Sequence, residues 1–124
     1  MSKFPKKQKL CNKKSIERLF SNSNTFFENP FRIIWKYEQN KDAVAIKSII
    51  VIPQKRLNLA VERNVVKRRI KESYRLHKYS LECYLNEIHK KISIGIIYQQ
   101  EKILDFTYLD EKIKLILKRL KEEL

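Results

Sequence analysis

The chain has 124 residues, with 28 Lys or Arg against 14 Asp or Glu, so its formal net charge at pH 7 is +14. This length fits a single domain with one core, and an apolar content of 43% is too high for a chain that is disordered by composition. The charge excess predicts a polyanionic partner, with nucleic acid ahead of an anionic membrane.

Several classes of protein are excluded by what the sequence lacks. No apolar run is long enough to cross a membrane, and the basic start of the chain has no apolar segment behind it, which argues against a signal peptide. Cys11 and Cys83 lie far apart and have no close Cys or His companion, so we expect reduced thiols rather than a metal site. The expected location is the cytoplasm.

Helical and strand patterns follow one another along the chain. Residues 1–11 are expected to form a mobile basic leader, and Asn12 is a suitable N-cap for the first helix. Pro53 ends the third strand because it lacks a backbone donor, and Thr107 with Asp110 resembles a capping box for the last helix. The expected helices cover residues 13–21, 59–79, 81–90 and a stretch from 107 onward; the expected strands cover residues 25–27, 31–37, 43–52 and 92–98.

Apolar spacing predicts which side chains form the core. The continuous apolar run at residues 43–52 is typical of a buried strand. The last helix carries one apolar stripe, made by Leu109, Ile113, Leu117, Leu120 and Leu124. The second strand alternates, with Phe31, Ile33, Trp35 and Tyr37 on one face and Arg32, Ile34 and Lys36 on the other. Residues 1–124 are therefore expected to form one α+β domain with the order α-β-β-β-α-β-α.

The helix expected at residues 59–79 is the most informative part of the chain. At about 100° per residue, Val65, Val66, Ile70, Leu76 and His77 gather on one side, which suits packing on a protein core better than insertion into a membrane. The opposite side, which we call the cationic arc, carries Arg63, Asn64, Lys67, Arg68, Lys71, Arg75 and Lys78. Such an array matches a sugar–phosphate backbone better than a small substrate.

Neighbouring charged residues refine this interpretation. Glu62 and Glu72 are expected to lie off the cationic arc, which leaves its cations without carboxylate partners. Arg69 falls on the apolar side, where we expect it to snorkel or to pair with an acid, and His77 is expected to be a packed core residue. Lys55 and Arg56, in the turn after the third strand, extend the basic track.

No catalytic residue and no metal ligand is assigned to this protein. A nuclease that uses two metal ions needs clustered carboxylates, whereas Asp42, Asp105 and Asp110 are widely separated. His77 and His89 are also isolated from each other, so they offer no acid–base pair. A DNA-binding helix-turn-helix protein is disfavoured as well, because strand residues and not a short helix precede the basic helix. A structural RNA-binding protein, such as a ribosomal one, stays open as the alternative.

Residues 51–78 resemble the signature region of the protein subunit of bacterial ribonuclease P. The shared features are a basic pair at Lys55-Arg56, then Ala60-Val61, Arg63-Asn64, Lys67-Arg68 and Lys71-Glu72 at the spacing of that family. Three positions depart from the family pattern. Val65 replaces an arginine, Lys71 replaces the closing arginine, and Leu57-Asn58 stands where the family has a glycine.

The resemblance implies a two-layer sandwich with a left-handed βαβ crossover, in an endoribonuclease that removes the 5′ leader of precursor tRNA. It also implies that the RNA subunit is the catalyst, with magnesium ions bound by that RNA and the substrate, and that the protein holds no cofactor. The resemblance places the leader in a cleft with Ile16, Phe20 and Ile34, where Phe20 is either core or a base-stacking aromatic. It places the RNA subunit against Lys55, Arg56, Arg63, Asn64, Lys67, Arg68, Lys71 and Arg75.

Overall fold

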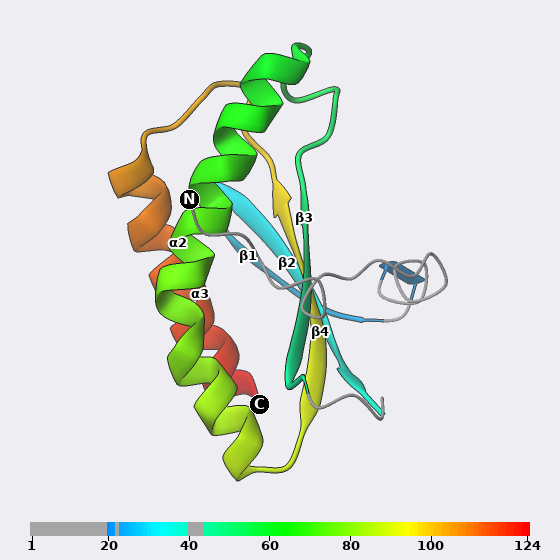
Figure 1. Cartoon of the computed structure of the whole chain (residues 1–124). Helices are drawn as coiled ribbons and strands as arrows, with labels where there is room; N and C mark the ends of the chain where they lie inside the picture. Colours follow the sequence, from blue (N-terminus) through cyan, green and yellow to red (C-terminus); the bar gives the residue numbers. More distant parts are fainter. Residues whose placement is uncertain (1–19, 22, 40–43) are drawn as a thin grey trace.

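The computed structural model describes residues 20–21, 23–39 and 44–124, which form two layers (Figure 1). One layer is a four-stranded sheet, and the other consists of two helices on one face of that sheet. Phe20 and Ser21 are helical, and the rest of the expected first helix, together with the basic leader, lies outside the described residues. The elements are β1 (Asn24–Glu28), β2 (Phe31–Glu38), β3 (Ile46–Val51), α2 (Ala60–Glu87), β4 (Lys91–Tyr98) and α3 (Phe106–Glu123).

The strands lie in the order β1-β2-β4-β3, so α2 connects two neighbouring strands. β1 pairs with β2 and β2 with β4 in antiparallel fashion, whereas β3 and β4 are parallel. A parallel pair needs a crossover, and α2 supplies it over the face that carries the core. The α+β class and the element order are confirmed, and the left-handed sense of the crossover stays a prediction.

The alternation expected for residues 31–37 is confirmed. Phe31, Ile33 and Trp35 belong to the main core beneath the helices, whereas Ile34 packs with Ile97 in a small cluster of its own. Tyr37 is the exception in burial, because it lies near the end of β2 and is exposed, with its hydroxyl donating to the Leu124 carbonyl at 3.3 Å.

The expectation of a buried strand at residues 43–52 is wrong in part. β3 is shorter and alternates between buried and half-buried residues, because it lies at the edge of the sheet and pairs only with β4. The fully buried strand is β4, which lies between β2 and β3 and is buried from Ile92 to Tyr98.

The expected break between two helical pieces at residues 79–81 is also wrong. α2 runs for 28 residues without interruption, because Leu81 and Leu85 continue the buried stripe begun by Val66 and Ile70. The helix ends where His89 adopts a left-handed conformation with φ 54°, and the Lys90 amide then donates to the Leu85 carbonyl at 3.0 Å. This closure satisfies a carbonyl that the helix end leaves free.

The capping box expected at Thr107 and Asp110 does not form. Asp105 is the N-cap of α3, and its side chain accepts a hydrogen bond from the Tyr108 amide at 2.8 Å. An aspartate three residues before an amide at a helix start is the usual arrangement, so the sequence did contain the signal. The apolar stripe of α3 is confirmed: its buried residues are Leu109, Ile113, Ile116, Leu117 and Leu120, and Leu124 packs against them.

Candidate nucleic-acid interface

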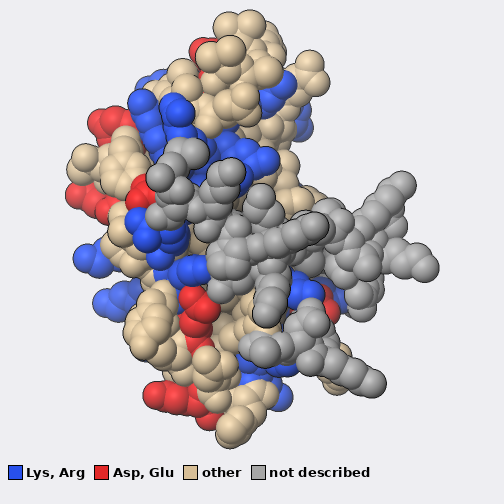
Figure 2. All heavy atoms as spheres, viewed as in Figure 1, with Lys and Arg blue, Asp and Glu red and all other residues tan. Residues whose placement is uncertain are grey.

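The first half of α2 presents exposed polar side chains on the side away from the core. Asn64, Lys67 and Arg68 are exposed, and Lys55 is exposed in the turn that precedes the helix. Within the described part of the chain, the side chains of these four residues form no hydrogen bond or ion pair. Lys and Arg side chains gather along the upper and middle parts of α2 in Figure 2. These cations are thus available to an anion outside the protein.

Arg63 occupies the same arc but is engaged by the protein itself. Its Nη1 donates to the carbonyls of Leu57 and Asn58, at 2.7 and 2.8 Å. These bonds hold the turn that carries Lys55 against the start of α2. Two charge-assisted bonds from one guanidinium are among the stronger polar contacts a surface can make. The structure therefore gives Arg63 a role in shaping the basic surface that the sequence alone does not reveal.

Arg56, in the same turn, is half-buried and lies 3.8 Å from the Glu101 carboxylate. The turn is closed by the amides of Arg56 and Leu57, which both donate to the Pro53 carbonyl. The basic pair is consequently split: Lys55 is exposed and unpaired, whereas Arg56 bridges to the loop after β4.

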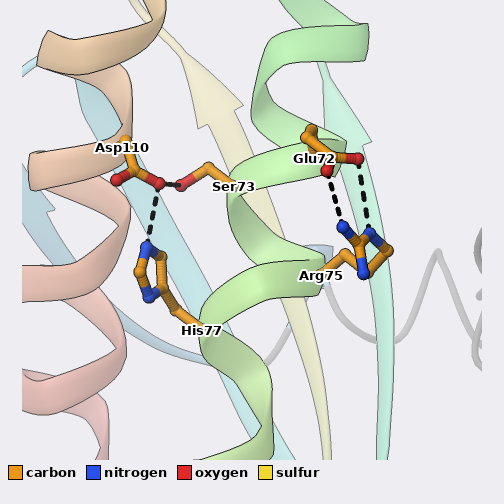
Figure 3. A network of polar contacts seen from close by, with 5 residues as sticks. All are labelled: Glu72, Ser73, Arg75, His77 and Asp110. Carbon is orange, nitrogen blue, oxygen red and sulfur yellow. Dashed lines mark hydrogen bonds and ion pairs between the residues drawn. The ribbon is translucent and has the colours of Figure 1, made fainter. Parts of the chain in front are cut away.

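The second half of the cationic arc is paired with carboxylates. Arg75 donates twice to Glu72, with its Nη2 2.6 Å from Oε1 and its Nε 3.3 Å from Oε2 (Figure 3). The expectation that Glu72 leaves the cations of the arc without a carboxylate partner is wrong, since positions three apart on a helix are neighbours. The hydrogen bond from Arg75 holds the pKa of Glu72 below its ordinary range. The same bond raises the pKa of Arg75.

Lys71 and Lys78 are less accessible than the arc predicts. Lys71 is half-buried. Only 12% of the Lys78 side chain is exposed, and its Nζ lies 3.8 Å from Glu82. Burial lowers the pKa of Lys78, because the low dielectric disfavours the charged ammonium. The exposed part of the arc is therefore its N-terminal half.

Asp110 of α3 binds two side chains of α2 at once. Its Oδ1 accepts a hydrogen bond from Ser73 Oγ at 2.7 Å and lies 2.9 Å from His77 Nε2 (Figure 3). His77 is half-buried and connects the two helices, so the expectation of a packed core residue is wrong. Arg69 stays out of the basic surface as expected, although its partner is the Leu104 carbonyl, 2.8 Å away, and not an acid.

The residues expected in a leader cleft differ in their exposure to solvent. Phe20 is 47% exposed, so it is not a core residue and offers an aromatic surface. Ile34 is 1% exposed and packs with Ile97 on the face of the sheet away from α2 and α3, so it serves the packing of the sheet. Ile16 lies outside the described residues.

Two other features are absent from the described residues, 20–21, 23–39 and 44–124. No group of three or more His, Cys, Asp or Glu is placed to hold a metal ion in these ranges. No helix in them is long and apolar enough to cross a membrane.

Together these features define the class of protein to which this chain belongs. A small α+β domain presents exposed cations on one helix and on the turn before it, and within the described residues these cations form no ion pair or hydrogen bond. This arrangement is that of a protein that binds a nucleic-acid backbone.

Comparison with known proteins identifies the family. The family model described as "Ribonuclease P" matches residues 4–121, and the chain belongs to this family. Two curated relatives, the ribonuclease P protein components of Porphyromonas gingivalis strains ATCC 33277 and W83, are 26% and 25% identical over 109 residues. Each alignment covers 88% of this chain and 80% of the relative.

Solved structures of ribonuclease P proteins share the fold. The Staphylococcus aureus protein superposes with a TM-score of 0.71 at 21% identity, over 92% of this chain and 95% of the other. The Thermotoga maritima protein superposes with a TM-score of 0.64 at 22% identity, over 84% and 89%. This chain is accordingly a protein subunit of ribonuclease P, an RNA-binding component of a tRNA-processing endonuclease that works with an RNA subunit.

Proposed function

We propose that this subunit binds its RNA partner with the exposed half of the cationic arc, through Asn64, Lys67 and Arg68, and with Lys55 of the adjoining turn. The observation that carries the proposal is that these three cations have no partner within the described chain. A cation that is already paired gains little by meeting a phosphate, because it must first leave its carboxylate. Unpaired cations gain the full release of counterions from RNA.

The proposed mechanism is binding and not chemistry by the protein. The RNA subunit hydrolyses the phosphodiester bond, with magnesium ions held by that RNA and by the precursor tRNA. A net charge of +14 screens the repulsion between the two RNAs as they approach each other. The protein therefore lowers the magnesium concentration at which the 5′ leader is removed. The cytoplasm is the proposed location.

The proposed leader contact centres on Phe20. This residue is exposed, and an exposed aromatic ring can stack on an unpaired base whatever its identity. Replacing such a ring by Ala costs about 1–3 kcal/mol per base. The variant Phe20→Ala should weaken binding of precursor tRNA and leave binding of mature tRNA, which has no leader, unchanged. An equal loss of binding affinity for both RNAs would contradict a contact between Phe20 and the leader.

Reconstitution tests the proposed function. Protein and candidate RNA subunit are combined with precursor tRNA at low magnesium, with protein alone and RNA alone as controls. We expect removal of the 5′ leader only when both are present, and a large rate loss for the double variant Lys67→Ala/Arg68→Ala. A matched variant, Lys90→Ala/Lys102→Ala, removes two exposed lysines elsewhere and should behave as the wild type. Cleavage by the protein alone would contradict the proposal.

A further inference from the structure

A second basic surface lies away from the cationic arc, where α2 and α3 run side by side (Figure 1). A groove of about 640 Å³ opens there between the two helices. α2 contributes the side with Ser80, and α3 contributes most of the other residues. The lining consists of His77, Ser80, Leu81, Glu111, Lys114, Leu115, Leu117, Lys118 and Lys121.

The floor of this groove is aliphatic. Leu81 and Leu117 are buried at its base, and Leu115 on its edge is 50% exposed. No aromatic side chain is among the lining residues, so the groove lacks the stacking platform that a single-stranded nucleic acid uses. A leucine side chain of a partner matches this surface, because covering the half-exposed Leu115 removes apolar surface from water on both sides.

The rim of the groove is cationic. Lys114 and Lys118 are exposed and form no hydrogen bond or ion pair in the described chain. Lys121 lies 3.4 Å from Ser80 Oγ and over the Tyr84 ring, so it is held at the end of the groove. The helical rise places Lys118 about 6 Å and Lys121 about 10 Å along the axis from Lys114. Carboxylates spaced by four and seven residues on another helix have the same separations.

This surface is distinct from the RNA-binding arc. Ser80, on the groove side of α2, is 12 residues from Arg68, which corresponds to about 120° around the helix axis and about 18 Å along it. Glu111, at the other end of the groove, repels a phosphate but can pair with a basic residue of a protein. A second copy of this chain is a poor occupant, because two chains of charge +14 repel each other.

We propose that the groove between α2 and α3 docks an acidic amphipathic helix of a partner protein. The apolar side of that helix covers Leu115 above the buried base of the groove, and its carboxylates meet Lys114 and Lys118. Docking of an amphipathic helix in an apolar groove, anchored at positions i, i+3 or i+4 and i+7, is a recurring mode of peptide recognition. This contact is additional to the binding of RNA and leaves the cationic arc free.

The test uses the full chain and a labelled synthetic peptide of about 16 residues, long enough to hold a helix. The peptide carries Leu on one side and Glu at positions spaced by four and seven. A scrambled peptide of the same composition controls for simple charge attraction, and a short oligouridine serves as the RNA probe. Lys114→Glu/Lys118→Glu reverses the rim. Lys90→Glu/Lys102→Glu is the matched variant, because it changes the net charge equally at exposed lysines elsewhere.

We expect the amphipathic peptide to bind at least tenfold more tightly than the scrambled one. The rim variant should lose about tenfold of that affinity, which is about 1.4 kcal/mol, and the matched variant less than twofold. Equal affinity for both peptides overturns the proposal, as does an equal loss in the two variants. A loss of oligouridine binding confined to the rim variant, with peptide binding unchanged, would overturn it in favour of a second RNA surface.

Discussion

The cationic arc on α2 carries three Lys or Arg residues in its first half, up to Arg68, and three in its second half, from Lys71, and the two halves differ in the partners of these cations. In the first half Lys67 and Arg68 are exposed and have no partner in the described chain. In the second half Arg75 is bound to Glu72, and Lys78 is largely covered beside Glu82. The difference teaches that a cationic arc on a helical projection is a set of candidates, and that nearby carboxylates decide which cations remain for a partner.

The largest expected effect on RNA binding follows substitution of Lys67 and Arg68, the two exposed cations of α2 that have no partner within the described residues. The variant Lys67→Ala/Arg68→Ala should weaken binding to the RNA subunit about 30-fold, which corresponds to about 2 kcal/mol. The slope of log K against log salt should become shallower by about 2, because two phosphate contacts are lost. Filter binding over a series of salt concentrations measures both quantities. An unchanged slope would show that neither residue meets a phosphate.

Substitution of Arg63 should lower the stability of the fold, whereas substitution of Lys67 or Arg68 should not. Arg63→Ala removes two bonds to the carbonyls of Leu57 and Asn58, and we expect the free energy of unfolding to fall by about 1–2 kcal/mol. Hydrogen exchange should quicken at the amides of Arg56 and Leu57, which close the same turn. Asn64→Ala is the control, because Asn64 is exposed and its side chain has no bond in the described chain. Equal stability of the two variants would deny Arg63 this role.

Substitutions at the Glu72–Arg75 pair should change RNA affinity much less. Arg75→Ala is expected to reduce RNA affinity less than threefold, since its guanidinium already binds Glu72. Glu72→Gln should raise the affinity about twofold, because it frees that cation near the RNA surface. The same filter-binding assay measures both variants. If Arg75→Ala lowered RNA affinity as much as Lys67→Ala/Arg68→Ala does, the two halves of the arc would not differ in RNA binding.

The smallest expected effect is a pH dependence of the Glu72–Arg75 pair. Because the pKa of Glu72 is lowered in the folded protein, its contribution to stability is present above the pKa of the unfolded chain. That contribution is lost as the pH falls through the lowered value. NMR titration of the Glu72 carboxyl should report the lowered pKa, and Arg75→Ala should return it to the ordinary range. The same titration curve in both proteins would show that the pair does not form in solution.

Part of the fold could be predicted because local patterns determine it. The alternation in β2 and the stripe of α3 follow from periods of two and 3.6 residues. The edge position of β3 could not be predicted, because it depends on the strand order and not on the composition of its own run. The continuity of α2 past Ser80 could not be predicted for a similar reason, since Leu81 and Leu85 gain their burial from tertiary packing.

The candidate site shows the same limit. Helical spacing and the family motif located the exposed cations at positions 67 and 68 and the turn at position 55. Two interactions could not be predicted: the hydrogen bonds from Arg63 to two carbonyls, and the contact between Asp110 and His77. Both depend on side-chain conformations that the sequence does not reveal. The pairing of Arg75 with Glu72 can be predicted from the sequence, because residues three apart on a helix are neighbours.

Photo-crosslinking between the protein and its RNA subunit tests the central claim most directly. A photoreactive amino acid at Ala60 lies on the cationic arc, one turn before Asn64, and replaces an exposed residue without charge. The same group at Leu115 reports on the groove between α2 and α3. The account predicts crosslinks to the RNA subunit from position 60 and none from position 115 in an active reconstituted enzyme. Crosslinks from position 115 with none from position 60 would contradict it.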